Sequence, residues 1–217
     1  MKMSRAFTSE EYEQKEVPIV IPPKIEETPD HDIVMRYSHG RSLEDPKLPY
    51  EIGMGFLKGE GEFFQSDEFA VKWLERAVKM GHAPAMVALA EFCLKDTKTY
   101  GFRRPARLLK QAADLGSDEA REYIDMSSIS DPSTKKAYTA YRLNGELGDI
   151  PACLALAEGF EKGYYGKDKS RAAATWYIRA FKLGDAEAAK KALALHYKKK
   201  TELTEEELSL LKPGKSS

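Results

Sequence analysis

The 217-residue sequence predicts an all-α solenoid of about four helix–turn–helix repeats. Three observations predict this fold: a recurring helix end that closes on glycine, small residues at fixed distances from that glycine, and a tryptophan at the same place in two repeats. A unit of two helices cannot bury its apolar face alone, so stacking against neighbouring units has to complete the core.

The closing glycines set the period of the repeat. They are Gly81, Gly116, Gly148 and Gly184, separated by 35, 32 and 36 residues. A glycine that follows an apolar-periodic run is typical of a helix C-cap, because glycine adopts the left-handed conformation without steric cost. Alanine occurs four positions after each of them, and Trp73 and Trp176 occur eight positions before the first and the last. Each closing glycine therefore predicts the turn between two repeats.

Apolar periodicity and capping residues predict ten helices. Their expected bounds are 47–58, 67–80, 83–95, 103–115, 117–126, 132–146, 150–162, 168–183, 186–199 and 204–212. Thr204 followed by Glu207 forms a capping box for the last of them. We therefore divide the chain into an extended or disordered N-terminal arm (1–45), a solenoid (46–200), and a C-terminal capping helix with a tail (201–217).

Two repeats carry a motif of glycines, alanines and aromatic residues at matching positions. The first reads Ile52-Gly53-x-x-Phe56-x-x-Gly59-x-Gly61, then Ala70-x-x-Trp73-Leu74-x-x-Ala77 and Gly81. The last reads Leu156-Ala157-x-x-Phe160-x-x-Gly163, then Ala173-x-x-Trp176-Tyr177-x-x-Ala180 and Gly184. Over residues 46–199 the chain resembles the Sel-one-like repeat (SLR) family, helical hairpins related to the tetratricopeptide repeat.

This resemblance implies a right-handed α/α superhelix whose concave face is lined by the first helix of each pair. In that family the concave face commonly serves in adaptors and scaffolds. The middle repeats depart from the motif. Repeat two has Cys93 and Asp96 where an aromatic residue and a glycine are expected. In repeat three, the segment 127–132 cuts the first helix short, and Gly145 lies inside the second.

The arm over residues 1–45 shows neither helical nor strand periodicity, and it carries ten acidic and six basic residues. Its apolar centre, Ile19, Val20 and Ile21, is flanked by prolines, which favour extended backbone. The arm is therefore either a disordered tail or an extended segment that lies on a partner or along its own solenoid. In the second case we expect the apolar triplet to contact the partner.

Residues that usually carry chemistry are few and scattered. The four histidines lack metal-binding spacing, and Cys93 and Cys153 fit buried apolar positions. The segment 166–170 lacks the earlier glycine, the hydroxyl residue and the preceding strand of a phosphate-binding loop. We therefore expect no catalytic residue, no metal site and no cofactor.

Charge and hydropathy bear on partners and location. The formal net charge of -1 favours neither nucleic acid nor an anionic membrane. No stretch approaches the ~18 apolar residues of a membrane span, and the first residues resemble neither a secretory signal nor a transit peptide. We expect an intracellular protein, in the cytoplasm or an organellar matrix. Basic residues gather in the second helices of repeats two to four. These residues either form a solvated face or bind an acidic protein partner or RNA. Few aromatic residues lie between them to stack on bases, which disfavours RNA.

The leading functional hypothesis is a protein-interaction module without catalytic activity, acting as an adaptor or scaffold or as a structural subunit of a larger assembly. The rival is a small-ligand or glycan- and peptidoglycan-related enzyme or binder, which requires a deep pocket with perturbed titratable groups. One face of the first helices points away from the second helices and passes from an apolar to an acidic end. Unless they pack against neighbouring repeats, we expect its residues to bind a peptide with aromatic and basic side chains: Tyr50, Met54, Leu57, Val87, Glu91, Leu94, Glu122, Met126, Leu154 and Glu158.

Overall fold

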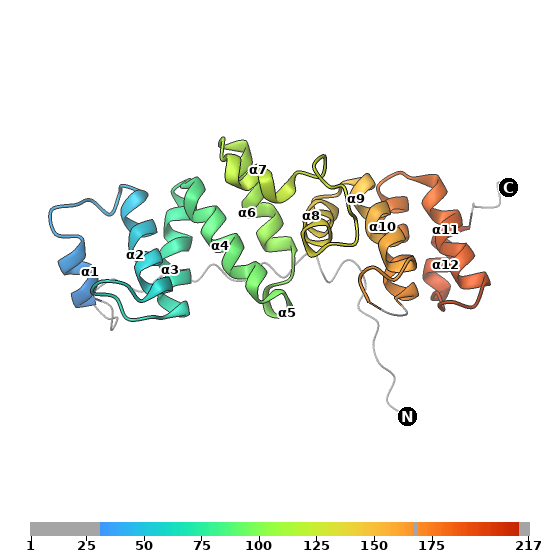
Figure 1. Ribbon diagram of the computed structural model, residues 1–217, viewed down its shortest axis with the longest axis horizontal. Coiled ribbons are helices and arrows are strands. Elements are labelled where there is room, and N and C mark those ends of the chain that lie inside the picture. Colours follow the sequence, from blue (N-terminus) through green and yellow to red (C-terminus); the bar gives the residue numbers. More distant parts are fainter. Residues whose placement is uncertain (1–30, 167–168, 213–217) are drawn as a thin grey trace, which may run out of the picture.

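The computed structural model describes residues 31–166 and 169–212, which contain twelve helices and no strand. The helices follow one another along the long axis of the molecule, from α1 at one end to α12 at the other (Figure 1). Their bounds are α1 His31–Tyr37, α2 Lys47–Lys58, α3 Asp67–Lys79, α4 Ala83–Lys95, α5 Thr97–Tyr100, α6 Arg103–Asp114, α7 Asp118–Ile124, α8 Lys135–Glu146, α9 Ile150–Glu161, α10 Ser170–Lys182, α11 Ala186–Tyr197 and α12 Glu205–Leu211. The predicted all-α solenoid is confirmed, and each predicted helix end lies within three residues of the observed one.

Consecutive helices pair into hairpins that stack along the row. The pairs are α2 with α3, α4 with α6, α7 with α8, α9 with α10, and α11 with α12. The single-turn helix α5 lies in the connection of the second hairpin. Each hairpin also packs against the next one, as α3 does against α4 and α8 against α9.

The turns between hairpins follow one local design. The closing glycines have positive φ values of 80°, 97°, 89° and 117°, as a left-handed C-cap requires. In three of the turns the next helix then begins at a Ser or Asp whose side chain accepts the backbone N–H three residues on, as Asp149 does from Ala152 at 2.7 Å. In all four turns the backbone N–H that is capped belongs to the alanine four positions after the glycine; in the first turn the acceptor is Nδ1 of His82. All four of these alanines are completely buried. The recurring alanine is therefore small because it lies where two hairpins meet.

The core consists of three clusters of buried side chains that succeed one another along the row. Trp73 and Trp176 are only 3% and 5% exposed, which confirms their predicted place between helix layers. Cys93 and Cys153 are completely buried, as predicted. Both tryptophans therefore occupy the position that the repeat period assigned to a large core residue.

Gly145, which departs from the repeat motif, makes room for Trp176. It is buried within α8, and a Cβ atom placed on it would lie 2.8 Å from Cζ3 of Trp176 and 3.2 Å from Cη2. A contact of 2.8 Å is shorter than carbon atoms tolerate, and an indole ring cannot bend away. The glycine is therefore required by the close approach of the Trp176 ring, carried by α10, to the backbone of α8.

The prediction that residues 1–45 form an extended or disordered arm is wrong for the part of this segment that the structure describes. Residues His31–Tyr37 form α1, whose Val34 is completely buried against the side chains of α2 and α3. A seven-residue helix spans only two turns, too short to display an apolar period, which is why the sequence concealed it. The triplet Ile19, Val20 and Ile21 lies outside the described residues, as does the predicted tail over 213–217.

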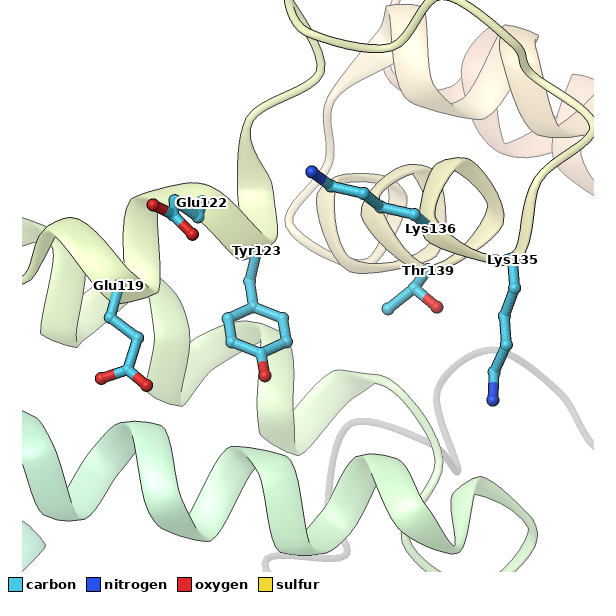
Figure 2. Close-up of a pocket in the computed structure, with 6 residues that line it drawn as sticks. All are labelled: Glu119, Glu122, Tyr123, Lys135, Lys136 and Thr139. Carbon is cyan, nitrogen blue, oxygen red and sulfur yellow. The ribbon is translucent and has the colours of Figure 1, made fainter.

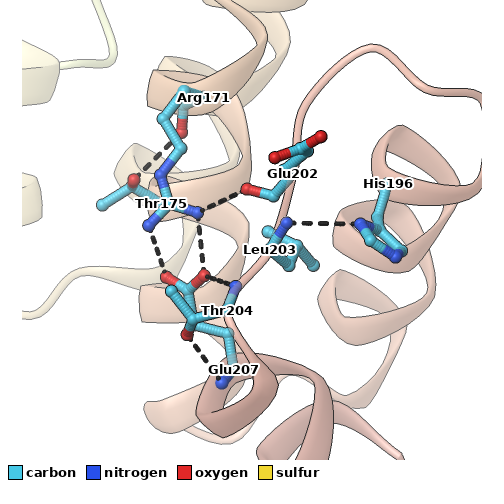
Figure 3. Close-up of polar contacts among 7 residues, drawn as sticks. All are labelled: Arg171, Thr175, His196, Glu202, Leu203, Thr204 and Glu207. Carbon is cyan, nitrogen blue, oxygen red and sulfur yellow. Dashed lines mark hydrogen bonds and ion pairs between the residues drawn. The ribbon is translucent and has the colours of Figure 1, made fainter. Parts of the chain in front are cut away.

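A network of charged and capping hydrogen bonds attaches α12 to the last full repeat (Figure 3). Arg171 donates to both carboxylate oxygens of Glu207, at 2.8 and 2.7 Å, and to the carbonyl of Glu202 at 3.2 Å. Glu207 and Thr204 form the predicted capping box. Nδ1 of His196 accepts the amide of Leu203 at 3.2 Å. The end of the solenoid is thereby closed by polar contacts as well as by buried Leu203 and Leu211.

We expect Gly145→Ala to destabilise the protein although alanine is the better helix former. Overpacking against Trp176 costs about 1–3 kcal/mol, which outweighs the gain of up to about 1 kcal/mol in helix propensity. Denaturant unfolding measures the change. In the Trp176→Phe background the cost should largely vanish, because phenylalanine lacks the outer indole carbons. An equal cost in both backgrounds would show that the ring is not the cause.

We expect Glu207→Gln to loosen α12 while keeping its capping box, since glutamine also accepts the Thr204 amide. Amide exchange in α12 should accelerate roughly tenfold at neutral pH, and Glu206→Gln in the same turn should have little effect. Although burial raises the pKa of Glu207, the hydrogen bonds from Arg171 and Thr204 outweigh it and lower that pKa below its ordinary value of 4.5. The stabilisation is therefore complete above pH 4.5 and disappears as the pH falls through the lowered pKa. A difference between wild type and variant that persists in stronger acid would contradict this assignment.

Candidate protein-binding face

Carboxylates and phenol rings from three successive first helices converge on one side of the solenoid. We call this surface the acidic–aromatic face and define it as Tyr50 and Glu51 of α2, Glu91 of α4, and Glu119 and Tyr123 of α7. The Tyr50 ring lies 4.8 Å from the ring of His82, the residue that caps α4. The face thus spans three repeats.

Tyr123 and Glu91 connect α7 to α4. The Tyr123 hydroxyl donates to a Glu91 carboxylate oxygen at 2.5 Å. Burial, this hydrogen bond and the charges of Glu91 and Glu119 raise the pKa of Tyr123 well above its ordinary value. The phenol therefore stays protonated and keeps the Glu91 carboxylate directed toward α7.

Negative charge from all three helices acts on Tyr50. Burial raises the pKa of Tyr50, and the carboxylates of Glu119, Glu91 and Glu51 raise it further. A site where three carboxylates disfavour an additional negative charge favours a positive one. The acidic–aromatic face is therefore suited to a basic side chain with apolar neighbours.

A hollow of about 460 Å³ adjoins this face between α7 and α8 (Figure 2). Glu119, Glu122 and Tyr123 form its α7 side, and Lys135, Lys136 and Thr139 form its α8 side. α7 has only seven residues, whereas α2, α4 and α9 have twelve or thirteen. The chain leaves α7 through turns in which Asp125 and Asp131 accept the amides of Ser127 and Ser133 at 2.8 Å. The short first helix of repeat three thus leaves the hollow open.

The structure distributes the predicted partner-binding residues over different environments. Tyr50 and Met54 line a groove beside α1, Glu122 lines the α7–α8 hollow, and Glu91 belongs to the acidic–aromatic face. Leu57, Leu94 and Leu154 are half-buried against the core clusters, and Met126 is half-buried just beyond α7. Glu158 pairs with Lys191 at 2.9 Å.

Val87 does not belong to any binding surface. It is 2% exposed and packs within the central core cluster, because residues 85–90 of α4 are buried on every side of the helix, which packs against both α3 and α6. Its prediction as a partner contact is wrong. The acidic part of the predicted face stays a prediction, now with a defined geometry.

Three residues of the acidic–aromatic face escaped the sequence prediction: Glu51, Glu119 and Tyr123. Glu119 and Tyr123 are four residues apart and therefore share one side of α7. That spacing was available in the sequence. Their meeting with Glu91 was not, since it depends on how α7 packs beside α4.

Five basic residues of the second helices α6, α8 and α10 form ion pairs with carboxylates. The ion pairs are Arg104–Glu75, Lys110–Asp114, Arg142–Glu146, Arg179–Glu146 and Arg171–Glu207. The Arg142 guanidinium also lies between the rings of Phe102 and Trp176, 4.6 and 4.9 Å from their centres. Arg104, Arg171 and Arg179 thereby join α6 and α10 to other helices, whereas Lys110 and Arg142 pair within their own helix.

Within residues 31–166 and 169–212, no three histidine, cysteine, aspartate or glutamate side chains gather into a group that could hold a metal ion. Burial raises the pKa of Cys93 and raises that of Cys153 to about 11. Both thiols are therefore protonated and shielded at neutral pH, which makes them poor nucleophiles. In the same ranges, no helix is long and apolar enough to cross a membrane.

No family model matches the chain, and no curated protein matches it. Several solved structures are similar to this chain, among them the following two. A protective antigen of uropathogenic Escherichia coli that displays an SLR fold is 18% identical, with 82% of this chain and 37% of that chain covered and a TM-score of 0.34. A Sel1 repeat protein from Oxalobacter formigenes is 19% identical, with 88% and 90% covered and a TM-score of 0.34. Both are SLR proteins, the family whose motifs this sequence resembles. The chain spans only about a third of the length of the first, and its own repeat fold rests on the hairpin packing described above.

We expect acid to weaken the cap of α4 beside Tyr50. Nδ1 of His82 accepts the Ala85 amide at 3.3 Å, which requires that nitrogen to be unprotonated. Burial lowers the pKa of His82 below 6.5, against the opposing effect of Asp45 and Glu51. Its stabilisation is therefore complete above pH 6.5 and is lost as the pH falls through the lowered pKa. Between about pH 7.5 and about pH 5, wild type should lose more unfolding free energy than His82→Asn, whose cap does not titrate. Equal losses would show that the cap does not depend on the protonation of His82.

Proposed function

We propose that this protein is a non-catalytic protein-interaction module that binds a basic segment of a partner protein on its acidic–aromatic face. In this role it is an adaptor or scaffold, or a structural subunit of a larger assembly. The observation that carries the proposal is the hydrogen bond by which Tyr123 of α7 meets Glu91 of α4, beside Tyr50 of α2, on which the charges of Glu51, Glu91 and Glu119 act.

The geometry favours a macromolecule over a small ligand. The face runs over α2, α4 and α7 and connects with the groove beside α1 and the hollow beside α8. An extended segment placed along it meets phenol rings and carboxylates in alternation, so that its basic side chains pair with carboxylates while its apolar side chains contact rings. Buried free thiols at Cys93 and Cys153 support an intracellular setting for this partner.

A displayed library of random 12-residue peptides, selected on the immobilised full chain, tests the proposal. We expect enrichment of Arg or Lys next to aromatic or aliphatic residues. For the enriched peptides, Glu91→Gln with Glu119→Gln should weaken binding roughly tenfold, equivalent to about 1.4 kcal/mol, and added salt should weaken it further. Both substitutions keep the shape of the side chain and remove only its charge.

The matched control is Glu187→Gln with Glu206→Gln, which removes the same charge from α11 and α12 at the far end of the row. Peptide affinity should be unchanged in this control. Selection that enriches no peptide, or enriches acidic ones, would refute a basic partner segment. Equal weakening by both pairs would show a diffuse charge effect rather than a binding face.

A further inference from the structure

A groove of about 570 Å³ lies at the N-terminal end of the acidic–aromatic face, between α1, α2 and the loop after α2. Aromatic side chains line it on three sides, with Tyr37 from α1, Tyr50 from α2 and Phe63 from the loop. Met54 adds an apolar floor, and Glu51 places a carboxylate among the rings. Glu60, Glu62 and Lys58 line the groove as well, so its rings and its excess of carboxylates suit a cation carried on an apolar stem.

The chain's own Arg41 already makes the contacts that such a cation would make. One of its terminal nitrogens lies 2.7 Å from a Glu51 carboxylate oxygen, and its guanidinium lies 5.7 Å from the centre of the Tyr37 ring. The Tyr37 hydroxyl donates to the same oxygen of Glu51 at 3.3 Å. The carboxylate and ring are thus already arranged for a guanidinium.

Arg41 makes these contacts from an exposed position. It belongs to the connection between α1 and α2, and 37% of its side chain remains exposed, against 26% for Glu51. Exposed ion pairs contribute little net stability, because solvent screens them and the long side chain loses entropy. A second arginine can therefore replace Arg41 at Glu51 at small cost, while Arg41 moves into water.

We propose that Arg41 is an internal substitute for an arginine of the partner segment. On binding, the partner's guanidinium displaces Arg41 from Glu51 and Tyr37, and the next apolar side chain of the partner contacts Met54 and Phe63. This inference rests on the proposed function and adds the identity of one anchoring residue. While Arg41 is paired with Glu51, the groove cannot bind the partner's arginine. The apparent affinity of the groove for the partner is therefore lowered in proportion to the time that Arg41 is bound there.

Two short peptides test this inference: acetyl-Ala-Leu-Arg-Phe-Ala-amide and the same peptide with neutral citrulline in place of arginine. Binding is measured by NMR titration, in which the ¹H–¹⁵N chemical shifts of the ¹⁵N-labelled full chain are followed as peptide is added. We expect the arginine peptide to bind Arg41→Ala about 3- to 5-fold more tightly than wild type, as removal of a weak competing ion pair predicts. Glu51→Gln should weaken its binding several-fold, and the citrulline peptide should not distinguish wild type from Arg41→Ala.

Lys190→Ala is the matched control, because it removes one exposed, ion-paired cation from α11 at the far end of the row. Its peptide affinity should equal that of wild type. If Arg41→Ala detaches α1, the chemical shifts around Val34 will change. In that case Arg41→Gln, which retains most of the side chain, replaces Arg41→Ala in the test. A gain in affinity for this variant supports the inference equally.

Unchanged or weaker binding of the arginine peptide to the Arg41 variants, or no binding at millimolar concentration, overturns the inference. The proposed function survives that result if the random library still enriches basic peptides whose affinity depends on Glu91 and Glu119. If the library enriches none, the proposed function fails as well. Equal gains for the arginine and citrulline peptides would show that the groove is opened without selecting a cation, which also overturns it.

Discussion

Every feature of this protein depends on the burial of one hairpin's apolar face against the next hairpin. A pair of helices of about twelve residues is too small to stabilise itself, so the row of hairpins folds because its neighbours share a core. The left-handed glycine and the buried alanine that follows it keep the spacing between hairpins short. At the far end, where no further hairpin follows, α12 covers the last apolar surface and the Arg171–Glu207 pair attaches it.

The departures from the repeat are where the surface becomes distinctive. Repeat three has a first helix of only seven residues, which opens the α7–α8 hollow and lets Tyr123 reach Glu91. Gly145 in the same repeat admits Trp176, so the core stays closely packed there. The shortened helix thus changes the exposed surface of repeat three, while its buried side chains stay tightly packed. This combination lets a solenoid keep its core while it varies the surface that meets a partner.

Charge is distributed according to helix position. Arg104, Arg142 and Arg179 of the second helices contact carboxylates or aromatic rings of other helices, so they help to hold the hairpins together. The carboxylates of α2, α4 and α7 gather instead around phenol rings on the acidic–aromatic face. A formal net charge of -1 conceals this separation, because it sums all 34 basic and 35 acidic residues of the chain. Partner chemistry therefore follows from local geometry rather than from overall charge.

The sequence by itself determined the helix order, the hairpin turns, the buried tryptophans and the C-terminal capping box. These depend on contacts within a few residues or on a period repeated several times, both of which a linear pattern records. It could not reveal α1, whose seven residues show too little periodicity, or the burial of Val87. Only the tertiary structure decided that the charges of Glu51, Glu91 and Glu119 act on Tyr50, and that Arg41 lies on Tyr37. Those residues are up to about 80 positions apart, and their meeting depends on the angles at which successive hairpins stack.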